Sequence, residues 1–359
     1  MRIVQAIETS GPGGAEQVLV QLCRKLRDDG HDVTALLLKE GALKRTLDGQ
    51  GFETVILPLS RPLDPPFGKA LRSYLRDVRA EVLHSHEITF ALYGRAASAW
   101  SGIAHVATAH GNNFHRGVKR KSAGAFFLRP TARFRLVSVS DALARQLAGG
   151  FLLRRESIEV VPNGVDIPVA DVAVSRQEGE PLRLLAVGNL YPVKNHAFSI
   201  RMVAALKKKG VQVELDILGR GGEEPRLREL IDALGLADLV RLRGFCSDVD
   251  SFLSRAHVLV SSSISEGMPM SFLEAMGARL PIVTSRVGGV PELIEEGVQG
   301  LLFESGDLPA AVNAIERLAK DEPLRRRLGE GGATTVRDRH SARLMVDRYV
   351  NLYKRLMIP

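Results

Sequence analysis

The stretch LRLLAVGNLYPVKNHAFSIRMVAALKKKGVQVELDIL, residues 182–218, decides the fold of this chain. The apolar residues at 182–187 predict a buried strand, and the turn at 188–194 contains Gly, Asn and Pro. The segment 196–208 predicts a helix, and the run 213–218 predicts a second strand. A strand, a loop, a helix and a strand in this order are the building unit of a parallel sheet covered by helices.

The start of the chain repeats this pattern. Residues 3–7 predict a strand, 11–14 a Gly-rich turn, 15–27 a helix and 33–38 a strand, and the second copy begins about 180 residues after the first. We therefore predict an α/β protein with two Rossmann-like, doubly wound parallel-sheet domains in tandem. The expected domains are 1–165 and 166–340, joined by a polar linker at 169–181, and a final helix at 341–359 is expected to pack back toward the first domain.

Strand and helix signals alternate along both halves, as a mainly parallel sheet requires. In the first half, further strands are expected at 54–57, 82–84, 105–109, 136–140 and 158–161, and helices at 68–79, 89–100 and 141–147. In the second half, further strands are expected at 240–242, 258–260, 282–284 and 300–303, and helices at 309–320 and 342–354.

The composition describes a protein with full cores and a polar surface. The chain has 359 residues, 45% hydrophobic and 25% charged, which suits two domains. Cys23 and Cys246 are its only cysteines, so neither a disulfide framework nor a cysteine metal site is expected. Since the chain has no signal peptide pattern and no run of about 18 apolar residues, we expect a cytoplasmic protein. Peripheral attachment to the inner face of the plasma membrane stays open.

The positive charge is concentrated in the first half. Residues 1–165 hold 23 Lys+Arg against 15 Asp+Glu, and residues 166–359 hold 26 of each. The segment 114–135, which begins with Phe114 and ends with Arg135, carries seven basic residues, two adjacent phenylalanines and no acidic residue. It could contact an anionic membrane surface, or it could be a solvated basic loop. Nucleic acid is not an expected partner, because no known binding motif is present.

Ligands of doubly wound sheets bind beyond the carboxyl ends of the strands. The loops expected there, in a cleft between two such sheets, are 8–16, 84–87, 110–113, 188–194, 219–222, 261–270 and 286–292.

The loop SSSISEGMPMSFLEAMG at 261–277 places Glu266 before an expected helix and Glu274 within it. Pro269 is expected at the first helical position, and Gly277 at the end of the helix. Backbone amides at this helix start, those of Gly267, Met268 and Met270, would form an anion site. Two carboxylates that can accept hydrogen bonds from hydroxyls, beside an anion site, suit a sugar nucleotide. The alternative is a pair of solvated glutamates around an ordinary turn.

The turn Gly11-Pro-Gly-Gly-Ala-Glu16 resembles a dinucleotide fingerprint, but Glu16 replaces its third glycine. Glu40 could still serve as the ribose-binding acid, so an NAD-dependent enzyme stays as an alternative. The simpler interpretation is that Gly13 and Gly14 let backbone amides approach a phosphate or an acceptor hydroxyl.

His84, His86 and His110 raise the question of a metal site, but no carboxylate cluster completes a ligand set. We interpret His84 and His86 as polar residues that end buried strands. His110 follows an apolar run and precedes Gly111, where it could donate to a sugar hydroxyl or be structural. Lys194 lies in the turn before a helix and can pair with a diphosphate, or it can be solvated.

Together these residues resemble the retaining glycosyltransferases of family 4, which have the glycosyltransferase B (GT-B) fold of two facing Rossmann-like domains. The resemblance covers nearly the whole chain. Its most specific part is a pair of glutamates separated by seven residues, Glu266 and Glu274. Supporting matches are GPGGAE near the start, TAHG around His110, VVPNGVD before the linker and VGNLYPVKNH in the second half.

The resemblance implies that the first domain serves the acceptor and the second binds the nucleotide sugar. Glu274 would bind the ribose, Glu266 would face a hydroxyl of the donor sugar, and His110 would contact that sugar. Lys194 and the amides of 267–270 would hold the diphosphate, and Gly13 and Gly14 would border the acceptor side. Asn189 departs from the family, which usually has an arginine there, and Arg220 is a candidate substitute.

The activity implied is transfer of a sugar from a nucleoside-diphosphate sugar to a saccharide or lipid-linked acceptor in bacterial surface polysaccharide assembly. UDP is the expected nucleoside diphosphate. No cofactor and no divalent metal are expected, since Lys194 and the helix start supply the positive charge. Retention would follow from front-face attack or from a covalent intermediate on Glu266. A sugar-nucleotide epimerase of the same fold, or a non-catalytic sugar-nucleotide sensor, would also fit these residues.

Overall fold

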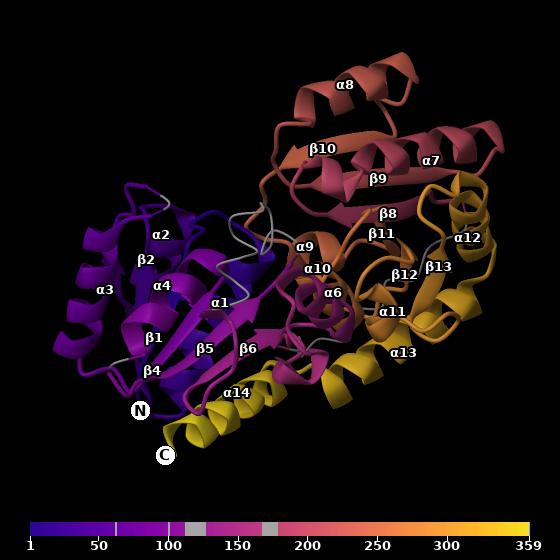
Figure 1. Ribbon diagram of the computed structural model, residues 1–359. Helices are drawn as coiled ribbons and strands as arrows, with labels where there is room; N and C mark the ends of the chain where they lie inside the picture. The colour runs from indigo at the N-terminus through magenta and orange to yellow at the C-terminus, as the bar shows by residue number, and fades with distance from the viewer. Residues whose placement is uncertain (62, 100, 112–126, 167–178, 359) are drawn as a thin grey trace. The chain divides into compact units, whose positions relative to one another are not determined.

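The computed structural model describes all residues except 62, 100, 112–126, 167–178 and 359 (Figure 1). The chain forms two compact units. The first unit contains Met1–Gly164 together with the C-terminal segment Ala342–Pro359, and the second contains Val165–Ser341. No helix within the described parts of the chain is both long and apolar enough to cross a bilayer.

The first unit is built on a seven-stranded parallel sheet with the order β3-β2-β1-β4-β5-β6-β7. Its strands are β1 (Arg2–Ile7), β2 (Asp32–Leu37), β3 (Glu53–Ile56), β4 (Val82–His86), β5 (Ala104–Ala109), β6 (Phe134–Ser138) and β7 (Ile158–Val160). The strand order changes direction between β1 and β4, so the loops that follow these two strands diverge there and leave room for a ligand.

Helices cover both faces of this sheet because successive side chains of a strand point to opposite faces. The helices of the unit are α1 (Gly14–Asp28), α2 (Ala42–Gly49), α3 (Pro65–Asp77), α4 (Ile88–Ser98), α6 (Asp141–Phe151) and α14 (Ala342–Met357). Val4 and Leu83 pack with α3 and α4 on one face. Gln5 and His84 point to the other face, which is covered by α1 and α14.

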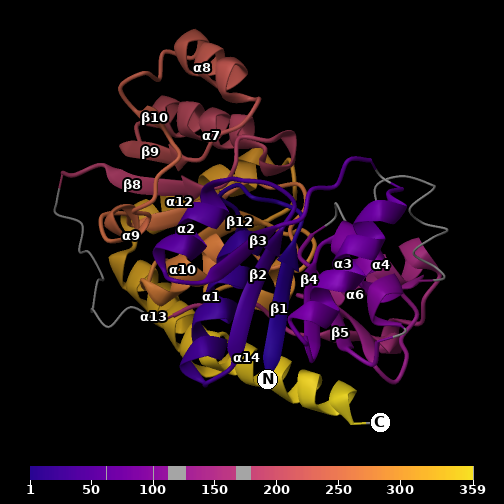
Figure 2. The same ribbon diagram turned by 90° about the vertical axis from the view of Figure 1, so that its left-hand side faces the viewer.

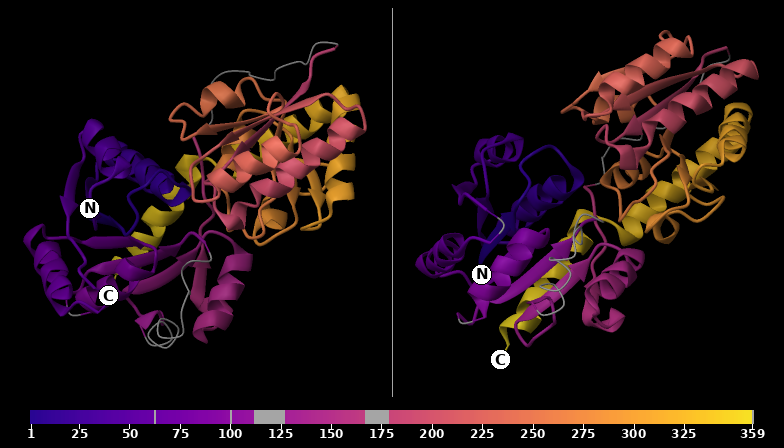
Figure 3. Two further views of the ribbon diagram at one scale, coloured as in Figure 1. Left: turned by 90° about the horizontal axis from the view of Figure 1, so that it is seen from above. Right: turned by 45° about the horizontal axis from the view of Figure 1, so that its top comes forward.

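Helix α14 returns the end of the chain to the first unit, where it packs against α1 and β5 (Figure 2). Two further views show it, in yellow, along the strands of that unit (Figure 3). Tyr349 and Tyr353 of α14 are fully buried. Arg343 forms an ion pair with Asp29 at 2.6 Å, so the helix is fixed by both apolar and charged contacts.

The second unit contains a six-stranded parallel sheet with the order β10-β9-β8-β11-β12-β13. The strands are β8 (Leu182–Val187), β9 (Val213–Leu218), β10 (Val240–Gly244), β11 (Val258–Ser261), β12 (Ile282–Ser285) and β13 (Gly300–Phe303). The helices are α7 (His196–Lys208), α8 (Glu224–Ala233), α9 (Asp250–Leu253), α10 (Met270–Gly277), α11 (Val290–Leu293), α12 (Leu308–Lys320) and α13 (Glu322–Arg339). Its strand order changes direction between β8 and β11.

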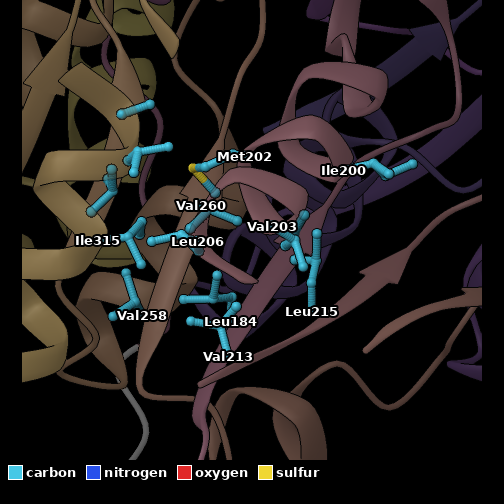
Figure 4. Close-up of a cluster of buried hydrophobic side chains, with 14 of the residues drawn as sticks. Leu184, Ile200, Met202, Val203, Leu206, Val213, Leu215, Val258, Val260 and Ile315 are labelled. Carbon is cyan, nitrogen blue, oxygen red and sulfur yellow. The ribbon is translucent and has the colours of Figure 1, made fainter. Parts of the chain in front are cut away.

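The core of this unit lies between the sheet and helices α7 and α12 (Figure 4). Helix α7 contributes Val203 and Leu206, α12 contributes Ile315, and the strands contribute Leu184 and Leu215. Since Leu206 is fully buried, its truncation to Ala should cost about 2–5 kcal/mol. This packing holds the end of β8 and the start of α7 in place.

Several boundaries and elements differ from the sequence-based expectations. Strand β4 continues to His86 instead of ending at His84, so both histidines lie inside a buried strand rather than in a loop at its end. Helix α3 begins at Pro65, because Asp64 caps it by accepting from the Phe67 N–H. Pro269 is the N-cap of α10 and not its first helical residue.

Helix α13 was not predicted, and neither were α2 and α8. The sequence of α13 contains three glycines, which disfavour helices. These glycines permit close packing: a Cβ at Gly329 would lie 2.1 Å from the Arg279 carbonyl oxygen, and one at Gly332 would lie 3.2 Å from Met276. Helix α13 therefore supports α10 from behind.

Candidate functional site

Two loops meet at the carboxyl edge of the second sheet, where its strand order changes direction. The loop after β8 carries Lys194, and the loop after β11 carries Glu266. Backbone bonds join them, since the Ile264 N–H donates to the Val193 carbonyl at 2.9 Å. The Ser262 hydroxyl adds a bond to the Asn195 carbonyl at 2.8 Å. These contacts place the two charged side chains at the position where ligands of such sheets bind.

The central contact of the site is the ion pair between Lys194 and Glu266. Lys194 Nζ lies 2.6 Å from Glu266 Oε1, and the Ser263 hydroxyl donates to the same oxygen at 2.6 Å. The Glu266 side chain is 9% exposed and that of Lys194 is 25% exposed. Among the residues that the structure describes, Glu266 Oε2 has no hydrogen bond. One carboxylate oxygen is thus held while the other is available to a ligand.

The glycine loop after β12 holds the backbone of Glu266. The Gly289 N–H donates to the Glu266 carbonyl at 3.0 Å. Gly288 adopts φ +51°, and a Cβ there would lie 2.0 Å from the same carbonyl oxygen. Only glycine satisfies both conditions. The sequence placed this loop, 286–292, at the carboxyl ends of the strands, and the structure shows that its glycines approach the backbone of Glu266.

Gly188 and His196 shape the turn that carries Lys194. A Cβ at Gly188 would lie 3.4 Å from Cδ and Cε of Lys194, so the lysine stem lies against this glycine. His196 Nε2 is 3.2 Å from the Gly188 carbonyl oxygen. Burial lowers the pKa of His196, which favours a neutral ring that donates Nε2–H to that carbonyl. Sequence reasoning missed His196 and Ser263, although both lie within the quoted motifs.

The turns that carry Asn189 and Arg220 lie side by side. The Leu190 N–H donates to the Arg220 carbonyl at 2.8 Å, which joins the turn after β8 to the turn after β9. The Arg220 guanidinium lies over the Phe245 ring, 5.0 Å from its centroid. The positive side chain expected at Asn189 is absent, and an arginine lies on the adjoining turn.

Helix α10 begins four residues after Glu266, next to the Lys194–Glu266 ion pair. Its N-cap, Pro269, makes no side-chain capping bond, and its first turn carries no acidic residue. Gly267, Met268 and Met270 are buried around this helix start. Glu274 lies in the second turn and is partly exposed. A helix start without a capping carboxylate favours an anion such as a diphosphate.

The Gly-rich turn of the first unit contains a carboxylate. Glu16 folds back onto it, and its Oε2 lies 2.6 Å from the place where a Cβ of Gly13 would be. The carboxylate accepts hydrogen bonds from Thr9 and from the Gly11 backbone, while burial raises its pKa. A phosphate at Gly13 and Gly14 would face this carboxylate. The arrangement therefore suits a hydroxyl better than the pyrophosphate of a dinucleotide.

Glu87 stands after β4, at the point where the first sheet changes direction. It adopts φ +69°, and its carboxylate accepts from the backbone N–H of His110. Burial, followed by the charges of Glu8 and Glu16, raises the pKa of Glu87 to about 8. The carboxyl of Glu87 is therefore largely protonated at neutral pH.

His110 follows β5, and its ring is held by a second histidine. His110 Nε2 lies 2.7 Å from His86 Nδ1, and burial lowers the pKa of His110 to about 4. His110 Nδ1 is buried and has no partner among the described residues. The described residues contain no group of His, Cys, Asp and Glu suited to a metal, and both nitrogens of His84 are taken by Tyr353 and Thr108.

The basic segment 114–135 lies mostly outside the described residues. Within its described part, Leu128 is buried and Phe127 is 38% exposed. Contact of this segment with an anionic membrane therefore stays a prediction.

Comparison with known proteins gives consistent matches for both units. The family model described as Glycosyl transferases group 1 matches residues 170–335, and the model described as Glycosyltransferase Family 4 matches residues 12–168. The chain is 27% identical over 331 residues to the putative glycosyltransferase EpsD of Bacillus subtilis, covering 85% of each chain.

Two further matches extend over most of the chain. It is 24% identical over 333 residues to the UDP-Gal:alpha-D-GlcNAc-diphosphoundecaprenol alpha-1,3-galactosyltransferase of Escherichia coli, covering 87% of this chain and 86% of that protein. The structure of Anabaena Alr3699/HepE in complex with UDP-glucose superposes with a TM-score of 0.86 at 21% identity and covers 98% of both chains.

Proposed function

Because the chain belongs to the family 4 type of glycosyltransferases with the GT-B fold, we propose that it transfers a sugar from a nucleoside diphosphate to an acceptor hydroxyl with retention of configuration. UDP is the proposed carrier, since the HepE structure contains UDP-glucose and the E. coli relative is named for UDP-Gal. The observation that carries the proposal is the Lys194–Glu266 pair beside the uncapped start of α10.

Binding of the donor would separate the Lys194 ammonium from the Glu266 carboxylate. The diphosphate would take the Lys194 ammonium and the amides at the start of α10, and a sugar hydroxyl would donate to Glu266. Glu274 would accept from the ribose hydroxyls. The resemblance further implies that His110 contacts the transferred sugar, and we keep this role as part of the proposal.

The chemical step would depend on stabilising the leaving group. The bond between the anomeric carbon and the diphosphate oxygen breaks, and the negative charge that develops on that oxygen is stabilised by Lys194 and the helix start. A diphosphate oxygen takes the proton of the acceptor hydroxyl, which attacks from the same face. Once Lys194 has moved to the diphosphate, Glu266 Oε1 still accepts from the Ser263 hydroxyl and the carboxylate also accepts from the sugar hydroxyl, which favours binding over a covalent role. Because these groups supply the positive charge, we propose that no divalent metal is needed.

The proposed acceptor is a saccharide or a lipid-linked saccharide of a bacterial surface polysaccharide. The name of the E. coli relative specifies a diphosphoundecaprenol-linked acceptor, and the first half of this chain carries all its excess positive charge. Flotation with vesicles that contain or lack anionic lipid tests the membrane part. We expect the protein to float only with anionic vesicles. If it floats with neither kind of vesicle, the proposed membrane contact is rejected.

The function is tested by incubating the protein with a panel of UDP-sugars and with acceptor extracts in excess chelator. Transfer that requires an acceptor is expected. Conversion of the donor alone would indicate an epimerase, and binding without turnover would indicate a sensor. A melting-temperature screen over sugar nucleotides and NAD identifies the ligand class first.

A further inference from the structure

A buried hydrogen-bond network lies between the first sheet and α14. It contains polar side chains from three neighbouring strands and from the helix: Gln5, His84, His86, Thr108, His110, Tyr349 and Tyr353. We propose that His86 is a positioning residue that fixes the ring plane and the tautomer of His110, so that His110 Nδ1 presents a lone pair to a hydroxyl of the ligand. This inference rests on the proposed sugar-binding role of His110.

The ring of His86 is held on both edges. Its Nδ1 lies 2.7 Å from His110 Nε2, and its Nε2 lies 3.0 Å from Gln5 Oε1. The rings of His86 and His110 are nearly coplanar, with planes 14° apart and centroids 5.1 Å apart, as a hydrogen bond in the plane of both rings requires. The His84 ring stacks on a face of His86, with centroids 4.3 Å apart. Rotation of His86 would break both bonds and the stacking contact with His84.

The protonation of the pair follows from burial. Burial lowers the pKa of His86 well below its usual value and that of His110 to about 4, so both rings are neutral at pH 7 and each carries one ring proton. Gln5 Oε1 accepts, which places the proton of His86 on Nε2. His86 Nδ1 is then an acceptor, and His110 must donate to it from Nε2. His110 Nδ1 is left without a proton.

This lone pair has no protein partner among the described residues, and the atom is buried. A buried nitrogen without a hydrogen bond lowers the stability of a fold. Gln5 Nε2 and His105 Nδ1 are also buried without a partner among the described residues, but His110 lies just beyond the carboxyl end of β5, where ligands of such sheets bind. A ligand hydroxyl that donates to Nδ1 would satisfy it. The chain of bonds therefore changes the expected role of His110 from donor to acceptor.

The anchor of the network is α14. Tyr353 OH lies 2.6 Å from His84 Nδ1, and Thr108 Oγ1 connects His84 Nε2 at 2.8 Å to Tyr349 OH at 3.1 Å. All four of these side chains are fully buried. The C-terminal helix thus holds His84, which packs against His86 and limits its motion.

The first test measures the tautomer directly by NMR of the full chain labelled with 15N-histidine, and the His110 signals are assigned by their loss in His110→Gln. We expect an unprotonated Nδ1 and a protonated Nε2. A protonated Nδ1 in the wild-type protein would overturn the inference, whatever the enzyme activity is.

The second test compares three variants. His86→Phe keeps a ring but removes both bonds, whereas His86→Asn keeps an acceptor near the Nδ1 position. The matched control is His105→Phe, which removes a buried histidine on the opposite face of the same sheet, bonded to Ser85 at 2.8 Å. His86→Phe should mix the two tautomers of His110 and lower kcat about tenfold or more, with the Kd for UDP unchanged. His86→Asn should restore both readouts in large part.

A His86→Phe protein with the same His110 spectrum and kcat as His105→Phe would contradict the inference. His86→Asn that is folded but no better than His86→Phe would also contradict it. If the wild-type protein transfers no sugar from any UDP-sugar, the proposed function fails, while the NMR measurement still decides the tautomer.

Discussion

Lys194 Nζ and Glu266 Oε1 lie 2.6 Å apart, although 72 residues separate them in the chain. The bond joins the loops that follow β8 and β11, the two strands between which the second sheet changes direction. Both side chains are largely buried. A partly buried pair in which one carboxylate oxygen has no hydrogen bond to the described part of the chain suits a ligand that brings both an anion and hydroxyls.

Removing the lysine should impair turnover far more than folding. In Lys194→Ala the diphosphate loses its cation, and we expect kcat to fall by about 10²–10³. Lys209→Ala is the matched control. Lys209 forms a similar ion pair with Glu316, at an N–O distance of 2.8 Å, and this pair lies outside the site. Steady-state kinetics and melting curves of both variants check this. Equal kcat in the two variants would remove Lys194 from the mechanism.

Gly288→Ala should displace Glu266. Gly297→Ala is the control: Gly297 also has positive φ, +79°, but a Cβ there meets nothing within 4 Å. Each change should cost about 1–2 kcal/mol for the backbone conformation. Gly288→Ala should cost a further 1–3 kcal/mol, roughly the cost of overpacking, and should weaken donor binding. Denaturant unfolding and calorimetric titration with the donor measure both. Identical donor affinity in the two variants would show that the contact does not position Glu266.

A third prediction concerns Asn189. If Arg220 supplies the missing cation, Arg220→Ala should weaken UDP binding about 10- to 100-fold, since a charge-assisted bond contributes about 1.5–3 kcal/mol. In the Asn189→Arg background the same change should have little effect. Titration of UDP into the wild type, both single variants and the double variant gives the coupling. Additive effects would show that Arg220 does not replace a cation at position 189, and an unchanged UDP affinity in Arg220→Ala would mean that Lys194 and the helix start bind the diphosphate without Arg220.

Glu87 predicts a pH dependence of stability. Its pKa is raised from 4.5 to about 8, so the folded state keeps a proton that the unfolded state releases. Stability should therefore fall as the pH rises from about 4.5 to about 8, and the loss should be complete above that. Glu87→Gln should reduce this slope, whereas the exposed control Glu229→Gln should not. Melting temperatures at pH 5, 7 and 9 measure this pH dependence. The same dependence in Glu87→Gln as in the wild type would contradict the raised pKa of Glu87.

The regular elements could be predicted from sequence where local pattern and tertiary environment agree. Strand β8 and helix α7 have the predicted bounds, because apolar runs and a turn with Gly, Asn and Pro mark them. Strand β4 was cut short at His84, since two buried histidines look like the polar end of a strand. Their burial depends on Tyr353 of α14, 269 residues away from His84, which no local pattern reveals. Helix α13 was missed because its three glycines disfavour a helix locally, whereas in the fold they make room for Met276, Arg279 and Val298.

The site shows the same division. The sequence pattern singled out Lys194, Glu266 and Glu274, and the family resemblance implied their roles, but neither showed that Lys194 and Glu266 bond to each other. It also missed Ser263 and His196, whose roles depend on loops brought together by the sheet. The loop 286–292 was placed at the strand ends, but the Glu266 carbonyl for which Gly288 makes room became visible only in three dimensions.

The most direct test of the account is product analysis with the best-binding UDP-sugar, with and without acceptor, for the wild type and Lys194→Ala in excess chelator. The account predicts that the wild type releases UDP and forms a retained glycoside only when acceptor is present, and that Lys194→Ala loses this activity. Donor turnover without any acceptor, or wild-type activity in Lys194→Ala, would contradict it.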